Sequence, residues 1–310
     1  MFRISILLAI ISLSFSIMGQ NLRQANDLNK KGLRLYENGD YDAAIENFTR
    51  SIELSSRLGS SKTSLKNNAF PQTGSDAAES HQITVIDPRT AAAYVNRGNA
   101  YFAKHEIDRA IADYDRAIAV SPGLAEAYMT RGSAWLVKRK LDKALADYER
   151  SIKIEPRFVK GYIGRGMTRV EMGDSKGALA DFDRAINLEP KNAEVYFRRG
   201  DVYRFGYEND SALADYEKAM NLDPEMSGPY IGRGCLRFDK KDFEGAIRDF
   251  SQAIRLDGRM IQAYKFRGYA LLSLGRDDEA QRDFDRAIRM APRFKAEIDE
   301  AIKLIKKANE

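Results

Sequence analysis

The chain has 310 residues, of which 44% are hydrophobic and 31% charged, and its 50 Lys and Arg against 45 Asp and Glu give a formal net charge of +5. This composition is typical of a folded protein and excludes a disordered tail. The single cysteine, Cys235, excludes an intrachain disulfide and a cysteine-based zinc site, and only two histidines are available for a metal site or a Ser-His-Asp triad. We therefore expect no enzyme activity, no cofactor, no metal and no small-molecule substrate.

The two signs of charge are finely interleaved along the chain. No run of Lys and Arg of the kind that binds nucleic acid or an anionic membrane stands out. Nucleic acid is therefore not an expected partner.

Residues 1–19 have the pattern of a targeting segment. Arg3 precedes an uncharged, mostly apolar stretch over 4–18, which as a helix would span about 22 Å, less than the ~30 Å core of a bilayer. A secretory signal peptide ending at Gly19 fits best, although Ile17 is larger than the residue usually found before such a cut. The segment predicts export to a periplasm or to the outside. An uncleaved membrane anchor and a core helix are the alternatives, and we expect membrane association only if the segment stays attached.

The strongest signal in the sequence is a period of 34 residues. Glycines recur at Gly98, Gly132, Gly166, Gly200, Gly234 and Gly268. Sixteen residues after each glycine stands an aromatic residue, namely Tyr114, Tyr148, Phe182, Tyr216, Phe250 and Phe284. A glycine inside a helix costs about 1 kcal/mol against alanine, so its recurrence predicts a close approach between a first helix (A) and a second helix (B) in each repeat.

These residues resemble the tetratricopeptide repeat, a 34-residue helix–turn–helix. The resemblance implies an all-α, right-handed superhelical solenoid of stacked antiparallel helix pairs. Six consecutive repeats are predicted at 91–124 (repeat 2), 125–158 (3), 159–192 (4), 193–226 (5), 227–260 (6) and 261–294 (7). Repeat 1 is predicted at 25–58, where Gly32, Ala44 and Phe48 keep the same frame.

Two further segments complete the predicted organisation. Residues 59–90 are rich in Ser, Asn and Gly and interrupt the period, which predicts a flexible insert over 59–82 and an ordered return over 83–88. The insert is interpreted as a linker, with a docking segment as the alternative. Residues 295–310 carry Ile298, Ile302 and Ile305 at helical spacing and predict a capping helix, which solenoids need at their ends.

A charged pair recurs in register. The residue before each helix A glycine is arginine: Arg97, Arg131, Arg165, Arg199, Arg233 and Arg267. The residue before each helix B aromatic is aspartate: Asp113, Asp147, Asp181, Asp215, Asp249 and Asp283. We interpret them as a ladder of structural ion pairs. The alternative is a track of arginines that binds an anionic glycan or nucleic acid in a salt-dependent way.

The resemblance implies a scaffold that binds a peptide or a partner helix in a concave groove lined by helices A. Mapped onto this chain, the groove positions include Val95, Asn99, Phe102, Met129, Lys160, Ile163, Met167, Phe197, Asp201, Arg204, Ile231, Phe238, Lys265 and Tyr269. The carboxylate clamp of some family members is only partly present, because Asn99 and Lys160 match it whereas Thr130 and Gly164 do not.

Two further arginines, Arg169 and Arg237, replace large apolar residues of the family pattern. Because an unpaired buried arginine is costly, they are expected to reach the groove or acidic neighbours such as Glu171, Glu194 and Asp239. Arg204, with Phe197 and Ile231, is a hypothetical contact for a carboxylate and an apolar side chain of the partner.

Overall fold

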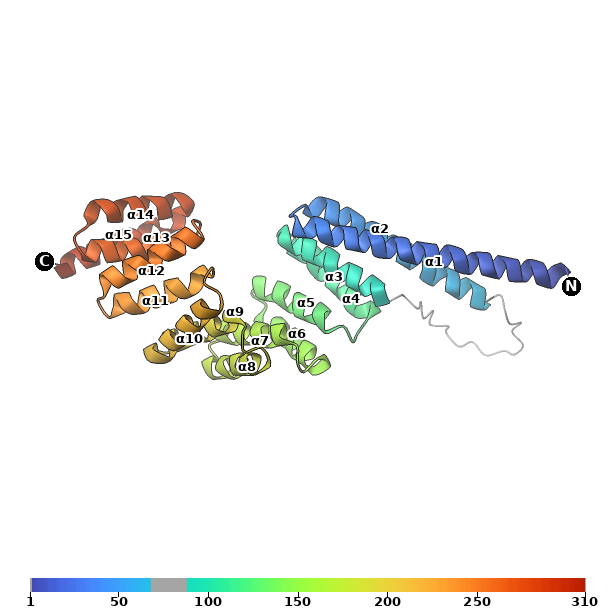
Figure 1. The fold of residues 1–310 in the computed structure, drawn as a ribbon, viewed down its shortest axis with the longest axis horizontal. Coiled ribbons are helices and arrows are strands. Elements are labelled where there is room, and N and C mark those ends of the chain that lie inside the picture. The colour runs from blue at the N-terminus through green and yellow to red at the C-terminus, as the bar shows by residue number, and fades with distance from the viewer. Residues whose placement is uncertain (1, 68–87, 310) are drawn as a thin grey trace. The chain divides into compact units, whose positions relative to one another are not determined.

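The computed structural model describes the backbone of residues 2–67 and 88–309 and the side chains of residues 19–56 and 89–308. Within these residues the protein consists of fifteen α-helices and one 3-10 helix, with no strand. The helices are α1 (Phe2–Glu37), α2 (Tyr41–Asn67), α3 (Pro88–Ala103), α4 (Ile107–Val120), α5 (Ala125–Val137), α6 (Leu141–Ile154), α7 (Val159–Glu171), α8 (Ser175–Leu188), α9 (Ala193–Phe205), α10 (Asn209–Leu222), α11 (Ser227–Asp239), α12 (Phe243–Leu256), α13 (Ile261–Ser273), α14 (Asp277–Met290), η1 (Pro292–Phe294) and α15 (Lys295–Asn309). They pack as consecutive antiparallel pairs (Figure 1), which confirms the predicted all-α fold of stacked helix pairs.

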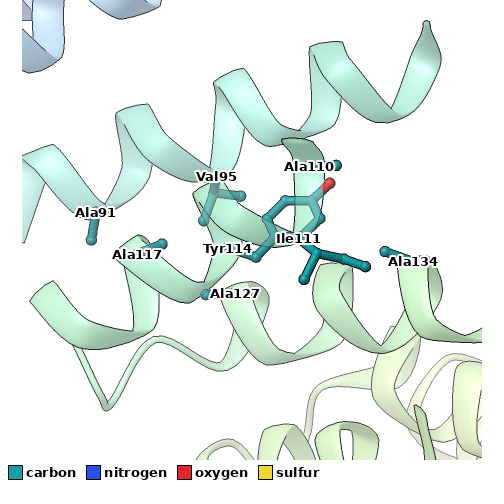
Figure 2. Packing of buried hydrophobic residues seen from close by; sticks show 8 residues of the cluster. All are labelled: Ala91, Val95, Ala110, Ile111, Tyr114, Ala117, Ala127 and Ala134. Atoms are coloured by element: carbon teal, nitrogen blue, oxygen red, sulfur yellow. The ribbon is translucent and has the colours of Figure 1, made fainter. Parts of the chain in front are cut away.

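The recurrent glycine and aromatic residue of each repeat hold its two helices together. A Cβ atom on Gly98 would lie 2.6 Å from the Tyr114 ring, and one on Gly234 would lie 2.6 Å from the Phe250 ring. Figure 2 shows Tyr114 of α4 packed among Ala110, Ala117 and the alanines of α5. Any side chain at this position would clash with the ring. Glycine therefore recurs in every repeat, although it makes the helix less stable than alanine would.

The chain divides into two compact parts, Met1–Gly164 and Arg165–Glu310. In the first part, α1 and α2 form repeat 1 and stack directly on repeat 2. Asn96 donates to Asn29 over 3.1 Å, and Arg97 donates to Thr49 over 2.9 Å. The two repeats are therefore neighbours in space although 32 residues separate them in the sequence.

The structure differs from the prediction for the start of the insert. Helix α2 continues to Asn67, so residues 59–67 are helical where a flexible segment was predicted. They contain Ser and Lys but no proline, and can therefore extend an existing helix at low cost. Residues 68–87 lie outside the described residues, and α3 begins at Pro88, a residue suited to the first turn of a helix.

Helix α1 runs without a break from Phe2 through the predicted targeting segment into repeat 1. Among the helices whose residues are described, none combines the length and apolar character needed to cross a bilayer. Cleavage of residues 1–19 stays a prediction.

The three-residue turn between helices A and B has a left-handed backbone at its second residue in every repeat. Glycine supplies it in three repeats, at Gly39, Gly173 and Gly275. In the other four the residue is His105, Arg139, Tyr207 or Lys241, with φ between 55° and 62°. Side chains other than glycine are strained in this region, and Tyr207 is also 89% exposed.

Candidate functional site: the inner face of helices A

The six ladder arginines all donate to the aspartate sixteen residues further along. Arg199 is representative: its Nε and Nη2 each lie 2.8 Å from one oxygen of Asp215, and its Nη1 lies 2.6 Å from Asp183 of the preceding repeat. Arg131 bridges two repeats in the same way through Asp147 and Asp115. These contacts join helices A and B and neighbouring repeats, so the ladder is a structural feature.

Arg169 and Arg237 are tied into the same ladder. Arg169 donates to Asp181 over 2.8 Å, and Arg237 donates to Asp249 over 2.9 Å. Each also donates to a backbone carbonyl at the start of helix B, that of Gly177 or Gly245. Arg169 also lies 3.7 Å from Asp174, and Arg237 lies 3.9 Å from Asp242. Both arginines therefore pair with acidic residues, namely the ladder aspartate and the aspartate that precedes helix B.

A second regularity links helix B to the inner face formed by helices A. The three tyrosines that pass under a helix A glycine each pair with a polar residue: Tyr114 donates to Asn99 (2.8 Å), Tyr148 lies 3.0 Å from Ser133, and Tyr216 donates to Asp201 (2.8 Å). Where helix B carries phenylalanine, the corresponding residue is Leu33, Met167, Cys235 or Tyr269. In six of the seven repeats the aromatic residue of helix B therefore matches the polarity of the helix A residue above it, and the exception is Phe284, which stands opposite Tyr269. The sequence contains this correlation, but we did not predict it.

In the C-terminal part, Asp201, Arg204 and Tyr216 form a hydrogen-bonded chain. The Tyr216 hydroxyl donates to Asp201, and Arg204 Nε donates to the same hydroxyl over 3.2 Å. Burial raises the pKa of Asp201, while the bond from Tyr216 and the charge of Arg204 oppose that rise. The Arg204 guanidinium also lies 4.3 Å from the centre of the Phe205 ring. The Arg204 side chain thus contacts both the Tyr216 hydroxyl and the Phe205 ring.

Cys235 lies on α11, the helix A that contacts both α9 and α13. Burial raises the pKa of its thiol to about 11, and the charges that act on it are those of Arg204 (α9), Asp239 (α11), Asp201 (α9) and Lys265 (α13). We call Phe197, Asp201, Arg204, Ile231, Cys235 and Phe238 the inner-face cluster. All six side chains are half-buried. Among the described side chains, no three His, Cys, Asp or Glu residues are grouped to hold a metal ion.

The structure divides the predicted groove residues into accessible and buried ones. Half-buried or exposed are Asn99, Phe102, Met129, Lys160, Met167, Phe197, Asp201, Arg204, Ile231 and Phe238. Val95 and Ile163 are buried, at 1% and 8% exposure. Val95 packs in the core of repeats 2 and 3 (Figure 2) and is removed from the site, because a partner cannot reach it.

Lys265 and Tyr269 are also buried, because helix α15 packs on α13. Lys265 Nζ lies 2.6 Å from Glu297 of α15 and 5.0 Å from the centre of the Phe294 ring. Tyr269 packs against Phe266 and Phe284, with ring centres 6.0 and 5.6 Å apart. Both residues belong to the contact with the C-terminal helix and not to an open groove.

The comparisons with known proteins agree with this geometry. Tetratricopeptide repeat profiles match residues 28–57, 91–124, 166–204, 193–226 and 231–293. The chain contains tetratricopeptide repeats. Among proteins of curated function, none matches the sequence significantly.

Several solved structures share the tetratricopeptide repeat fold. A tetratricopeptide repeat protein from Parabacteroides merdae is 19% identical, with a TM-score of 0.63 over 92% of this chain and 99% of that one. A chain of the APC/C hetero-tetramer Cut9–Hcn1 is 14% identical, with a TM-score of 0.64 over 86% of this chain and 52% of that one. PilF of Pseudomonas aeruginosa is 18% identical, with a TM-score of 0.57 over 67% of this chain and 97% of that one. At these identities the similarity concerns the fold alone, and the fold suggests a protein–protein interaction scaffold.

Proposed function

We propose that this protein is an exported, non-enzymatic scaffold that binds a peptide or a partner helix along the inner face of its helices A. The observation that carries the proposal is the inner-face cluster, to which α9 and α11 contribute apolar, acidic and cationic side chains around Cys235. Solenoids use such extended surfaces, built from equivalent positions of successive repeats, for binding.

The chemistry of the cluster favours a partner segment with a carboxylate next to an apolar side chain. Arg204 forms no ion pair among the described side chains, and its Nε is held by Tyr216. Arginine is well suited to a bidentate contact with a carboxylate. Phe197, Ile231 and Phe238 are half-buried and offer apolar surface beside it.

The alternative of a polyanion track along helices A is less well supported. It needs free arginines, whereas each of the six ladder arginines is bonded to a buried aspartate. Binding through that track would have to break the contacts that join the repeats.

Export is supported by the charge and apolar pattern of residues 1–19. The intact mass of native protein tests it. A chain that begins at Gln20 supports export with cleavage, whereas a chain that retains residues 1–19 refutes cleavage.

Site-specific photo-crosslinking tests the binding surface. A photoreactive amino acid replaces Phe238 in the inner-face cluster or, as the control, Lys218, which is exposed on α10. After irradiation in an envelope or secreted fraction, adducts are identified by mass spectrometry. The proposal expects a defined protein adduct from position 238 and not from 218. Adducts only from 218, or the same adducts from both positions, would contradict it.

A further inference from the structure

The outer face of helices B carries an unusual concentration of arginine in the last two repeats. Four positions of helix B and the turn after it point away from helix A. In repeat 6 they hold Arg248, Gln252, Arg255 and Arg259, and in repeat 7 they hold Arg282, Arg286, Arg289 and Arg293. All seven arginines are exposed. We call these seven residues the arginine face.

Among repeats 2 to 7, only repeats 6 and 7 have arginine at the first of the four positions, whereas the other positions are also basic in earlier repeats, as at Arg150, Lys153 and Arg157 of repeat 3. In repeats 2 to 5 the first of the four positions is alanine, namely Ala112, Ala146, Ala180 and Ala214. Helices α12 and α14 lie on the same side of α13, because Arg267 of α13 donates to Ser251 of α12 and to Asp283 of α14. Equivalent positions of successive repeats face the same way, so the two rows of arginine form one surface, which is about 10 Å long on α14 between Arg282 and Arg289.

Few carboxylates neutralise this surface. Arg259 lies 3.5 Å from Asp257 and is 91% exposed, and Arg255 donates to the neutral Gln252. Glu279 accepts both hydrogen bonds of Arg276, at 2.8 Å each.

Asp285 accepts a hydrogen bond from Gln281. Two further exposed carboxylates, Glu244 and Asp278, stand one helical turn before Arg248 and Arg282. Among the seven arginines, only Arg259 forms an ion pair with a described side chain; Arg248, Arg255, Arg282, Arg286, Arg289 and Arg293 form none. Their repulsion is relieved only in part, since Arg276 and, to a lesser degree, Arg282 lower the pKa of Glu279.

We propose that the arginine face docks peripherally on a bilayer containing anionic phospholipids. Guanidinium groups match the geometry of phosphate, and clusters of this size are attracted to anionic membrane surfaces. None of the eight outer positions is apolar or aromatic, so the surface has no wedge for insertion and no platform for stacking nucleic acid bases. The inference does not depend on peptide binding at the inner-face cluster.

Vesicle co-sedimentation of the full chain tests the proposal. The probes are vesicles of neutral phosphatidylcholine and vesicles with about one third phosphatidylglycerol. The test variant combines Arg248→Gln, Arg282→Gln, Arg286→Gln and Arg289→Gln. The control variant removes the same charge from four separate helices by Arg116→Gln, Arg150→Gln, Arg184→Gln and Lys218→Gln. Both variants keep residues 1–19, so insertion of that segment affects them equally.

We expect binding to anionic but not neutral vesicles, release when the salt rises from about 0.05 to about 0.3 M, and a loss of at least about tenfold in the test variant. The control variant should stay within about threefold of the parent. Equal losses in both variants, no difference between anionic and neutral vesicles, or no vesicle binding at all would overturn the proposal. Tighter binding to a short DNA duplex than to anionic vesicles, lost in the test variant, would assign the surface to nucleic acid instead.

Discussion

Replacing Asp215 with alanine is the sharpest test of the arginine ladder. Asp215 is 5% exposed and accepts two hydrogen bonds from Arg199, whose side chain is 20% exposed. Asp183, the other partner of Arg199, is half exposed at 51%. The same guanidinium thus binds one buried carboxylate, that of Asp215, and one exposed carboxylate, that of Asp183.

The difference in burial sets the expected energies. Removing one partner of a buried ion pair costs about 3–5 kcal/mol, because a charge is left without compensation. Since Arg199 keeps Asp183 and some solvent contact, we expect Asp215→Ala to lower the free energy of unfolding by about 2–4 kcal/mol. Asp183→Ala removes a solvent-exposed partner and should cost about 0–1 kcal/mol.

Urea unfolding followed by far-ultraviolet circular dichroism measures both variants. The combined variant Arg199→Leu with Asp215→Leu should recover at least half of the loss caused by Asp215→Ala, because no buried charge is then left unpaired. Equal costs for Asp215→Ala and Asp183→Ala would refute the reasoning, as would a combined variant that is less stable than Asp215→Ala.

Three further predictions follow from single contacts. Tyr216→Phe removes the hydroxyl that donates to the half-buried Asp201 carboxylate, and it should lower the free energy of unfolding in urea by about 1–3 kcal/mol. Adding Asp201→Met should restore most of this loss. If it does not, the matching of helix B to the inner face is disproved. Tyr207→Gly relieves a left-handed residue with φ of 62° and should raise stability by about 1 kcal/mol, whereas Gly173→Ala should lower it; an unchanged melting midpoint for both would show that the turn is not strained. Because the pKa of Cys235 is raised to about 11, its thiol should react with iodoacetamide at neutral pH at least about tenfold more slowly than in the unfolded chain; equal rates would contradict its burial.

The repeat architecture was predictable because it depends on residues that recur at fixed spacing. The contact between Gly98 and the Tyr114 ring is made by side chains whose positions the 34-residue period sets. The pairing of each arginine with the aspartate sixteen residues on follows from the same period. The contacts predicted from the 34-residue period are thus the contacts that the packed helices make, as is expected of a sequence that folds to one structure.

The details of the inner face were less predictable, because they depend on what packs on top of each helix A. Val95 occupies a groove position by count, yet its neighbours in repeat 3 bury it. Lys265 has the same repeat position but is covered by α15 through Glu297. Arg169 reaches Asp181 as well as Asp174, which is nearer in the sequence. In each case the surroundings of the side chain depend on neighbouring helices, and the spacing of residues in the sequence does not specify these contacts.

The most direct test of inner-face binding is the affinity of the crosslinked partner for variants of Arg204. Calorimetric titration compares the parent chain, Arg204→Ala and the control Lys218→Ala, and melting curves are recorded for each. We predict that Arg204→Ala weakens binding by about 1–3 kcal/mol, the contribution of a charged hydrogen bond, with little change in melting temperature, while Lys218→Ala binds like the parent. If Arg204→Ala binds normally and melts several degrees lower, Arg204 belongs to the scaffold, and the assignment of the inner-face cluster as the binding site is contradicted.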